Sequence, residues 1–131
     1  MQKDKLWRVV RVENQHGHGP YISHELMNPY PPIQGASSPR RPITCNDGID
    51  ASGGLWSRSY ENIRHGFASI EKLYRWFDDA DEIRAMQAAG YKIAVYEVHP
   101  TYALLGKCQL IFHAEYAERV DEMPLSPEGR E

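Results

Sequence analysis

Apolar and polar positions follow a regular pattern in separate stretches of the chain, and the first of these predicts a strand. The stretch LWRVVRVE, from Leu6 to Glu13, is rich in valine and contains a tryptophan, a composition typical of strands. Trp7, Val9 and Arg11 fall on one face of this strand. Arg11 therefore either has a buried partner, because an unpaired buried charge is costly, or reaches solvent at the strand end.

The clearest periodic stretch, GFASIEKLYRWFDDADEIRAMQAAG, predicts two consecutive helices. Apolar residues recur with the i, i+3, i+4, i+7 spacing of one amphipathic helix over Ile70–Phe77, and Ser69 stands at its N-cap position. The sequence DDAD interrupts this pattern. Asp81 is then expected to cap a second helix that runs through Ala89, and Gly90 is expected to end it.

The C-terminal third predicts further strands. YKIAVYEV, residues 91–98, alternates as a central strand does, and KCQLIFH, residues 107–113, predicts another, with TYALLG between them as a connection. AEYAERVDEM, residues 114–123, fits either a short helix or a last edge strand. We expect a single domain of residues 1–131, of α+β class with two short helices, and a mobile tail at residues 122–131.

Residues 14–55 show no sustained period of 2 or 3.6 and contain six prolines. A loop of about 40 residues is unusual inside a compact domain and is usually functional or disordered. Its apolar residues can pack, so we expect a long irregular N-terminal loop that is ordered as a lid. Aromatic and arginine side chains in and after it suit either a planar anionic ligand or a protein surface, or else they fill the core. These side chains are Tyr21, Tyr30, Trp56, Tyr60, Arg40, Arg41, Arg58 and Arg64.

Composition excludes several classes of protein. The chain has 131 residues, of which 41% are hydrophobic and 25% are charged, as in ordinary globular domains. A net charge of -3 argues against direct nucleic-acid binding. The N-terminus lacks the apolar region of a signal peptide, and no apolar run approaches the roughly 20 residues that cross a bilayer. We therefore expect a cytoplasmic protein that does not associate with membranes.

Motifs for familiar chemistry are not found. The sequence contains neither GxxxxGK[ST] nor GxGxxG for phosphates, and it has no GxSxG nucleophile elbow. His16 and His18 form an H-x-H pair near His24, but zinc needs three or four ligands, and no cysteine or carboxylate partner is evident. We therefore predict no metal site.

The order of elements and several short sequences resemble small ADP-ribosyltransferase-type domains of bacteria and phages. The similarity is carried by a first strand that contains Arg11, by FAS leading into a helix, and by the strands KIAVYEV and QLIF. Such domains include anti-CRISPR proteins that modify host defence machinery. The resemblance implies a small split antiparallel β-sheet core that binds NAD as its cofactor.

The same resemblance implies roles for individual residues. It implies that the cofactor is bound by Arg11, Tyr21, Ser69 and Tyr74. In such domains a catalytic residue late in the sequence orients the attacked ribose, and here this residue would be Gln109, with Glu97 as the other candidate. A carboxylate near the ribose stabilises the oxocarbenium-like state of NAD cleavage, which a glutamine cannot do.

Two functional hypotheses follow. The first is an NAD-dependent ADP-ribosyltransferase-like protein that modifies a protein target in phage–host conflict, and it requires Arg11 and Ser69 to enclose one cavity. The alternative is a non-enzymatic, anti-CRISPR-like inhibitor that uses the aromatic and proline-rich loop 14–55 as its recognition surface. Both have a protein partner, and the sequence leaves its identity and the oligomeric state open.

Overall fold

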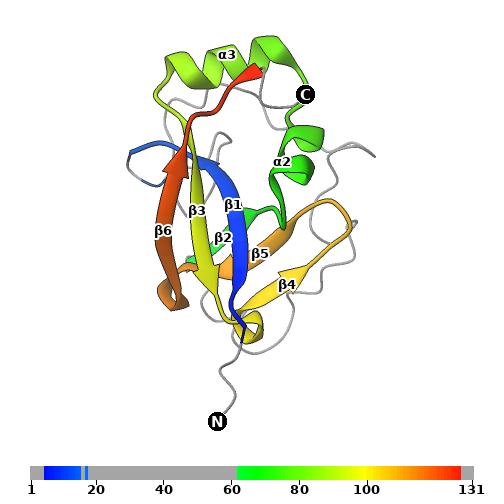
Figure 1. Ribbon diagram of the computed structural model, residues 1–131, viewed down its shortest axis with the longest axis vertical. Coiled ribbons are helices and arrows are strands. Elements are labelled where there is room, and N and C mark those ends of the chain that lie inside the picture. Colours follow the sequence, from blue (N-terminus) through cyan, green and yellow to red (C-terminus); the bar gives the residue numbers. More distant parts are fainter. Residues whose placement is uncertain (1–4, 16, 18–61, 128–131) are drawn as a thin grey trace.

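The computed structural model describes residues 5–15, 17 and 62–127. These residues form two three-stranded antiparallel sheets and two α-helices (Figure 1). The first sheet has the strand order β1–β3–β6, and the second has the order β2–β5–β4. The predicted α+β class, with a divided antiparallel sheet and two short helices, is confirmed.

The first sheet contains the strands that the sequence pattern predicts best. They are β1 (Trp7–Glu13), β3 (Lys92–Val98) and β6 (Ala117–Met123). β3 lies in the centre and pairs with β1 over its whole length. Of the two possibilities for residues 114–123, the edge strand is correct, and a short 3₁₀ helix at Ala114–Tyr116 precedes it.

The second sheet contains two strands that the sequence does not predict. β5 (Leu110–His113) lies between β2 (Ile63–Gly66) and β4 (Ala103–Leu105). The TYALLG stretch is therefore not a simple connection, because it forms a 3₁₀ helix at Pro100–Tyr102 and then β4. The predicted strand over residues 107–113 is shorter in the structure, since pairing begins only at Leu110.

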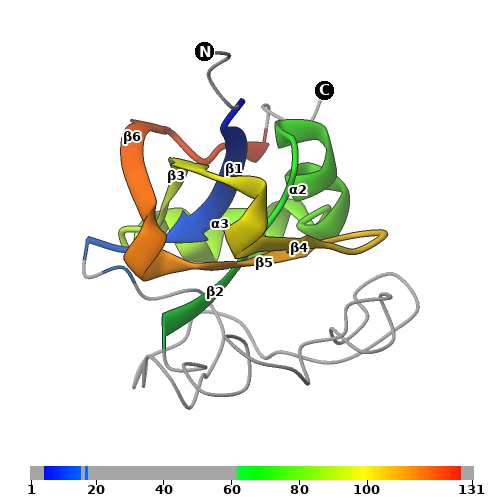
Figure 2. The ribbon, with the colours of Figure 1, turned by 90° about the horizontal axis from the view of Figure 1, so that it is seen from below.

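The two sheets meet at the free edge of β1. Val10 and Phe67 form a single antiparallel bridge, in which each backbone N–H donates to the other residue's carbonyl oxygen at 2.9 and 2.8 Å. Gly66 allows this approach, because a Cβ atom at residue 66 would lie 2.6 Å from the Val9 Cγ1 atom. The second sheet consequently lies across one side of the first (Figure 2).

The first helix follows the sequence prediction closely. α2 spans Ile70–Trp76, and the Ser69 hydroxyl oxygen accepts a hydrogen bond from the backbone N–H of Lys72 at 3.1 Å. This bond satisfies one of the N–H groups left without an intrahelical partner in the first turn. Ser69 is therefore the N-cap, as predicted.

The second helix begins earlier than predicted. α3 spans Ala80–Ala88, and its N-cap is Asp79 rather than Asp81. Asp79 has extended backbone, and its carboxylate accepts from the backbone N–H of Asp81 at 2.8 Å. Asp81 lies in the first turn of the helix. Gly90 follows the helix with φ +87, so its predicted role at the C-terminus is confirmed.

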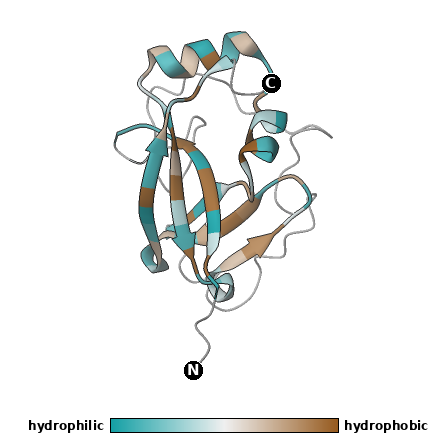
Figure 3. Ribbon diagram, in the orientation of Figure 1, coloured by the Kyte–Doolittle hydropathy of each residue, from teal (hydrophilic) through white to brown (hydrophobic). Residues whose placement is uncertain are grey.

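β1 and β3 separate two apolar cores because both of their faces are buried. On one face Val10, Val12, Ile93 and Val95 pack with the two helices. On the other face the core is Val9, Val98, Ala103, Leu110 and Phe112. In Figure 3 the hydrophobic colour accordingly marks β1, β3 and β5, whereas β6 is mostly hydrophilic.

The segment predicted as a mobile tail, residues 122–131, is in part built into the fold. Glu122 and Met123 pair in β6. Leu125 is only 1% exposed and belongs to the core that contains the helices. These three residues are therefore held by the rest of the domain, while residues 128–131 lie outside the description.

Gly66→Ala tests the junction between the sheets. The added methyl group would collide with Val9 and the Val10 carbonyl, so we expect a loss of about 1–3 kcal/mol in the free energy of unfolding. Chemical denaturation followed by circular dichroism measures it. Gly90→Ala is the matched control, since it meets open space and only its backbone conformation is strained. A smaller loss at Gly66 than at Gly90 would contradict the proposed close approach.

Candidate functional site

A buried pair of opposite charges lies on β1. Arg11 and Glu13 are each 4% exposed, and the Arg11 Nε atom lies 3.0 Å from Glu13 Oε1. The Arg11 Nη1 atom donates to the carbonyl oxygen of His65 at 3.2 Å, and Nη2 donates to that of Gly17 at 3.3 Å. Of the two expectations for Arg11, the buried partner is correct. The Arg11 guanidinium thus connects β1 by hydrogen bonds to β2, at His65, and to the segment after β1, at Gly17.

Other strands of the first sheet complete this polar cluster. The Tyr96 hydroxyl group donates to Glu13 Oε1 at 2.7 Å, and Arg119 Nε lies 3.7 Å from Glu13 Oε2. Tyr96 of β3 and Arg119 of β6 are register partners, so they reach Glu13 from the same face of the sheet. Ala94 stands opposite Arg11 in β3, and its small side chain leaves room for the guanidinium.

Burial and neighbouring charges shift the pKa values in the cluster. Burial lowers the pKa of Arg11, while the Glu13 carboxylate acts in the opposite direction. Burial and the hydrogen bond to Glu13 raise the pKa of Tyr96 to about 12. Tyr96 is therefore a neutral hydrogen-bond donor at physiological pH, and Arg11 keeps its charge.

Three of the predicted site residues lie on different sides of the first sheet. Arg11 shares its face with Val9, whereas Tyr74 packs in the core with Val10 on the opposite face. The Tyr74 hydroxyl oxygen accepts from the backbone N–H of Ser126 at 3.1 Å. Ser69 caps α2, which packs on the same face as Tyr74. The Arg11 side chain thus lies on one face of the first sheet, and α2, the helix that Ser69 caps, packs on the other face.

The remaining predicted residues lie at other places in the fold. Glu97 of β3 forms an ion pair with Arg8 at 3.5 Å. Gln109 is buried directly before β5. Tyr21 lies outside the described residues, as does nearly all of loop 14–55. The roles of all these residues in NAD binding or catalysis stay predictions.

Sequence reasoning identified only Arg11 in the polar cluster. Glu13 stands two residues further along the same strand, so their shared face was a signal that could have indicated the pair. Tyr96 and Arg119 carry no such signal, because only the pairing of β1, β3 and β6 brings them to Glu13.

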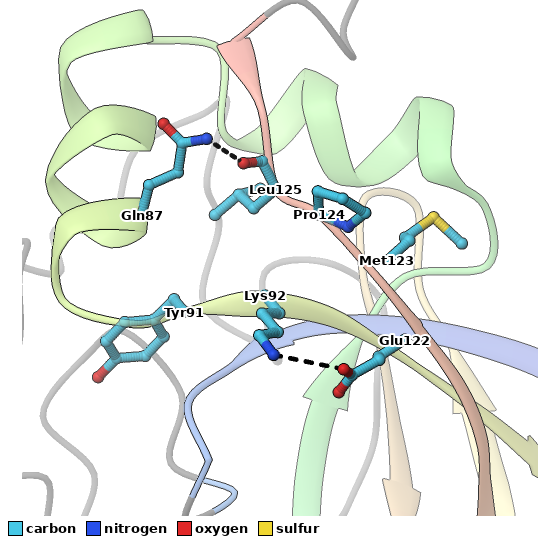
Figure 4. Close-up of a pocket in the computed structure, with 7 residues that line it drawn as sticks. All are labelled: Gln87, Tyr91, Lys92, Glu122, Met123, Pro124 and Leu125. Atoms are coloured by element: carbon cyan, nitrogen blue, oxygen red, sulfur yellow. Dashed lines mark hydrogen bonds and ion pairs between the residues drawn. The ribbon is translucent and has the colours of Figure 1, made fainter.

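A cavity of about 330 Å³ opens between α3, the beginning of β3 and the chain after β6 (Figure 4). Lys92 Nζ lies 3.3 Å from Glu122 Oε1 on one side of it, and Gln87 Nε2 donates to the Leu125 carbonyl oxygen at 2.6 Å on the other. The lining residues are Gln87, Tyr91, Lys92, Glu122, Met123, Pro124 and Leu125.

Aromatic side chains gather at the opposite end of the first sheet, where β1 and β6 begin, and two of the three are exposed. The rings of Tyr102 and Tyr116 stack with centroids 4.2 Å apart and planes inclined by 16°. Tyr116 is 48% exposed and Trp7 is 37% exposed, and Leu6 beside Trp7 is also exposed. Trp7 pairs with Val98, which pairs with Ala117 directly after Tyr116. We call Leu6, Trp7, Tyr102 and Tyr116 the aromatic end.

His113 lies beneath this surface. Its ring is fully buried and its centroid is 4.9 Å from that of Tyr116. Within the part of the chain that the structure describes, neither ring nitrogen has a hydrogen-bond partner. The imidazole therefore supports the Tyr116 ring by packing alone.

Comparison with known protein families finds a match over most of the chain. A family model described as "Bacteriophage T4 Y00F protein" matches residues 1–126. No curated protein and no solved structure matches the chain. Among the described residues, none of the helices has the length and apolar character needed to cross a membrane.

Glu13→Gln tests the buried pair. The substitution leaves Arg11 buried without its counter-charge, so we expect a loss of about 3–5 kcal/mol in the free energy of unfolding. Urea denaturation measures the loss. Glu71→Gln is the control, because it breaks an exposed pair with Arg75 at 2.8 Å that should contribute less than about 1 kcal/mol. Equal losses for the two variants would contradict the role given to Glu13.

Tyr96→Phe tests the raised pKa. The pKa of Tyr96 is about 12 in the folded protein and about 10 in the unfolded chain. The stability that the neutral hydroxyl group contributes is therefore fully present below about pH 10 and is lost as the pH rises toward about 12. We expect the stability gap between wild type and Tyr96→Phe to be constant at neutral pH and to narrow only above about pH 10. A gap that closes near neutral pH would exclude this assignment.

Proposed function

The chain belongs to the bacteriophage T4 Y00F protein family, and from this membership and the surface of the fold we propose that it is a non-enzymatic recognition protein. In this proposal it binds a protein partner through the aromatic end. The observation that carries the proposal is the stack of the half-buried Tyr102 on the exposed Tyr116, at the same end of the first sheet as the exposed Trp7. The family match confirms the phage part of the sequence-based resemblance.

The aromatic end has the properties of a protein-binding surface. Tyrosine and tryptophan dominate binding energy at protein interfaces, since each offers a large apolar area and a polar atom at its rim. The Tyr102–Tyr116 stack, with its centroids 4.2 Å apart, already holds both rings in place. Less conformational entropy is then lost on binding than with free side chains.

The contacts of the candidate chemical groups support recognition rather than catalysis. Arg11 is bound to Glu13 and to two backbone carbonyl oxygens. Ser69 caps a helix. A group with such structural partners must break them before it can bind a cofactor. NAD binding and ADP-ribosyl transfer therefore stay predictions.

The proposal changes where recognition takes place. The sequence-based alternative used loop 14–55, which lies almost entirely outside the described residues. The aromatic end consists of Trp7 of β1, Leu6 directly before it, and one tyrosine from each of two 3₁₀ helices. A host defence protein as the partner, and a role in phage–host conflict, belong to this proposal.

Trp7→Ala and Tyr116→Ala test it. Tagged wild-type protein in bacterial lysate should retain one partner stoichiometrically, and each variant should weaken binding of that purified partner by about 30-fold or more, the loss typical of an interface hot spot. Isothermal titration calorimetry gives the affinities. Val120→Ala removes another exposed apolar side chain, on β6, and should bind as wild type does.

Two results would contradict recognition through this surface. One is a complex whose affinity is unchanged in both aromatic variants. The other is transfer of label from NAD to a lysate protein that Arg11→Ala abolishes, which would favour the transferase hypothesis instead. Circular dichroism of each variant shows that the fold is intact.

A further inference from the structure

We propose that the cavity between α3 and the first sheet is a binding site for a small organic anion with an apolar body, and that Lys92 provides the charge that recognises it. The site is at the other end of the sheet from the aromatic end, and the proposal does not depend on the recognition function. It rests on the charges around the cavity, on its apolar wall and on its size.

The first observation is a continuous chain of ionic contacts that leads to the cavity. Lys92 Nζ lies 3.3 Å from Glu122, and Glu122 lies 3.0 Å from Arg119. Arg119 lies 3.7 Å from Glu13, which contacts Arg11 at 3.0 Å. The signs alternate along these five residues, with three cations and two carboxylates. Within this series of five residues, one positive charge is therefore left without a balancing carboxylate.

The second observation decides where a ligand can meet this excess charge. At the inner end, Arg11 is buried and donates to the carbonyl oxygens of His65 and Gly17. At the outer end, the Lys92 side chain is 56% exposed and lines the cavity. Asp121 does not line the cavity, and one of its carboxylate oxygens accepts from the backbone N–H of Glu122 at 2.8 Å. Arg119, between the two ends of the series, has a side chain that is 41% exposed but does not line the cavity, so Lys92 is the cation of this series that a ligand in the cavity meets.

Glu122 positions the Lys92 side chain through an exposed ion pair that a ligand can displace. Arg119, followed by Lys92, holds the pKa of Glu122 below its usual range, so the carboxylate is ionised at neutral pH. Exposed ion pairs are weak, and an anion in the cavity can therefore share or replace this contact. Glu122 is then a competitor of the ligand.

The walls favour a ligand with an apolar body. One side of the cavity is lined by Met123, Pro124 and Leu125 (Figure 4). A hydrogen bond of 2.6 Å from Gln87 Nε2 to the Leu125 carbonyl oxygen holds this segment in place. The volume of about 330 Å³ lies at the lower limit of small-molecule sites, about 300–1,000 Å³. A carboxylate or a phosphate monoester on a single ring has this size and charge.

The experiment titrates the full chain with benzoate, with phenyl phosphate and with neutral benzyl alcohol, followed by backbone amide shifts in NMR. Saturable shifts at Lys92, Met123 and Leu125 with either anion, and at least tenfold weaker binding of the alcohol, are expected. The two anions distinguish a carboxylate from a phosphate ligand. Binding in the wild-type protein should also weaken as salt concentration rises, because the attraction is screened.

Two variants with opposite expected effects separate recognition from a structural role. Lys92→Gln should weaken anion binding at least tenfold, whereas Glu122→Gln should strengthen it severalfold because the competing carboxylate is gone. A purely structural role would weaken binding in both. Arg84→Gln is the control, since Arg84 lies on the same helix as Gln87, pairs with Asp81 and does not line the cavity.

The proposal is overturned by any of three results. These are no saturable shifts with either anion, equal binding of the neutral alcohol, and weaker binding in Glu122→Gln than in wild type. If Lys92→Gln does not fold, the salt dependence of the wild-type protein decides the role of charge. Salt-independent binding then counts against the proposal.

Discussion

The fold depends on the burial of one ion pair, Arg11 with Glu13, on β1, a strand that is covered on both faces along its second half. Taking two charges out of water costs several kcal/mol for each ion unless their remaining hydrogen-bonding groups are satisfied. Here two backbone carbonyl oxygens accept hydrogen bonds from the two terminal nitrogens of the guanidinium, and the Tyr96 hydroxyl group donates to the carboxylate. Within the described residues, the buried Arg11 Nε atom makes no hydrogen bond and has only its ion-pair contact with Glu13. Three strands and the chain at Gly17 must be in register before these contacts exist together.

This constraint also places the two surfaces that are open to a ligand or partner. The pair lies toward the end of the first sheet where β1 ends and β3 begins, and Glu13 stands opposite Lys92 there. The cavity that Lys92 borders therefore adjoins the pair, and the aromatic end is at the far end of the same strands. The aromatic end lies where β1 begins and β3 ends, and the cavity lies where β3 begins beneath α3 (Figure 1). Two binding events at these places need not compete, since the whole length of β3 separates them.

The sequence could predict the parts of this structure whose signal is local. Helical periodicity and the Ser69 cap fix α2, and alternation fixes β1 and β3. β2 and β4 have four and three residues, too few for a periodic signal, and they exist because β5 lies between them. Tyr96 is 83 residues from Glu13 in the chain, so its place in the cluster follows from strand register alone. The aromatic end was missed for the same reason.

Arg11 and Lys92 show why residue type alone does not identify a functional cation. Both belong to one chain of ionic contacts, yet their surroundings differ. Arg11 has a carboxylate and two carbonyl oxygens within reach and is closed off from water. Lys92 shares a single carboxylate with Arg119 and borders a cavity. A bound anion must replace several buried partners at Arg11, whereas at Lys92 it competes with one exposed carboxylate, so the arginine of the first strand is the poorer ligand-binding group.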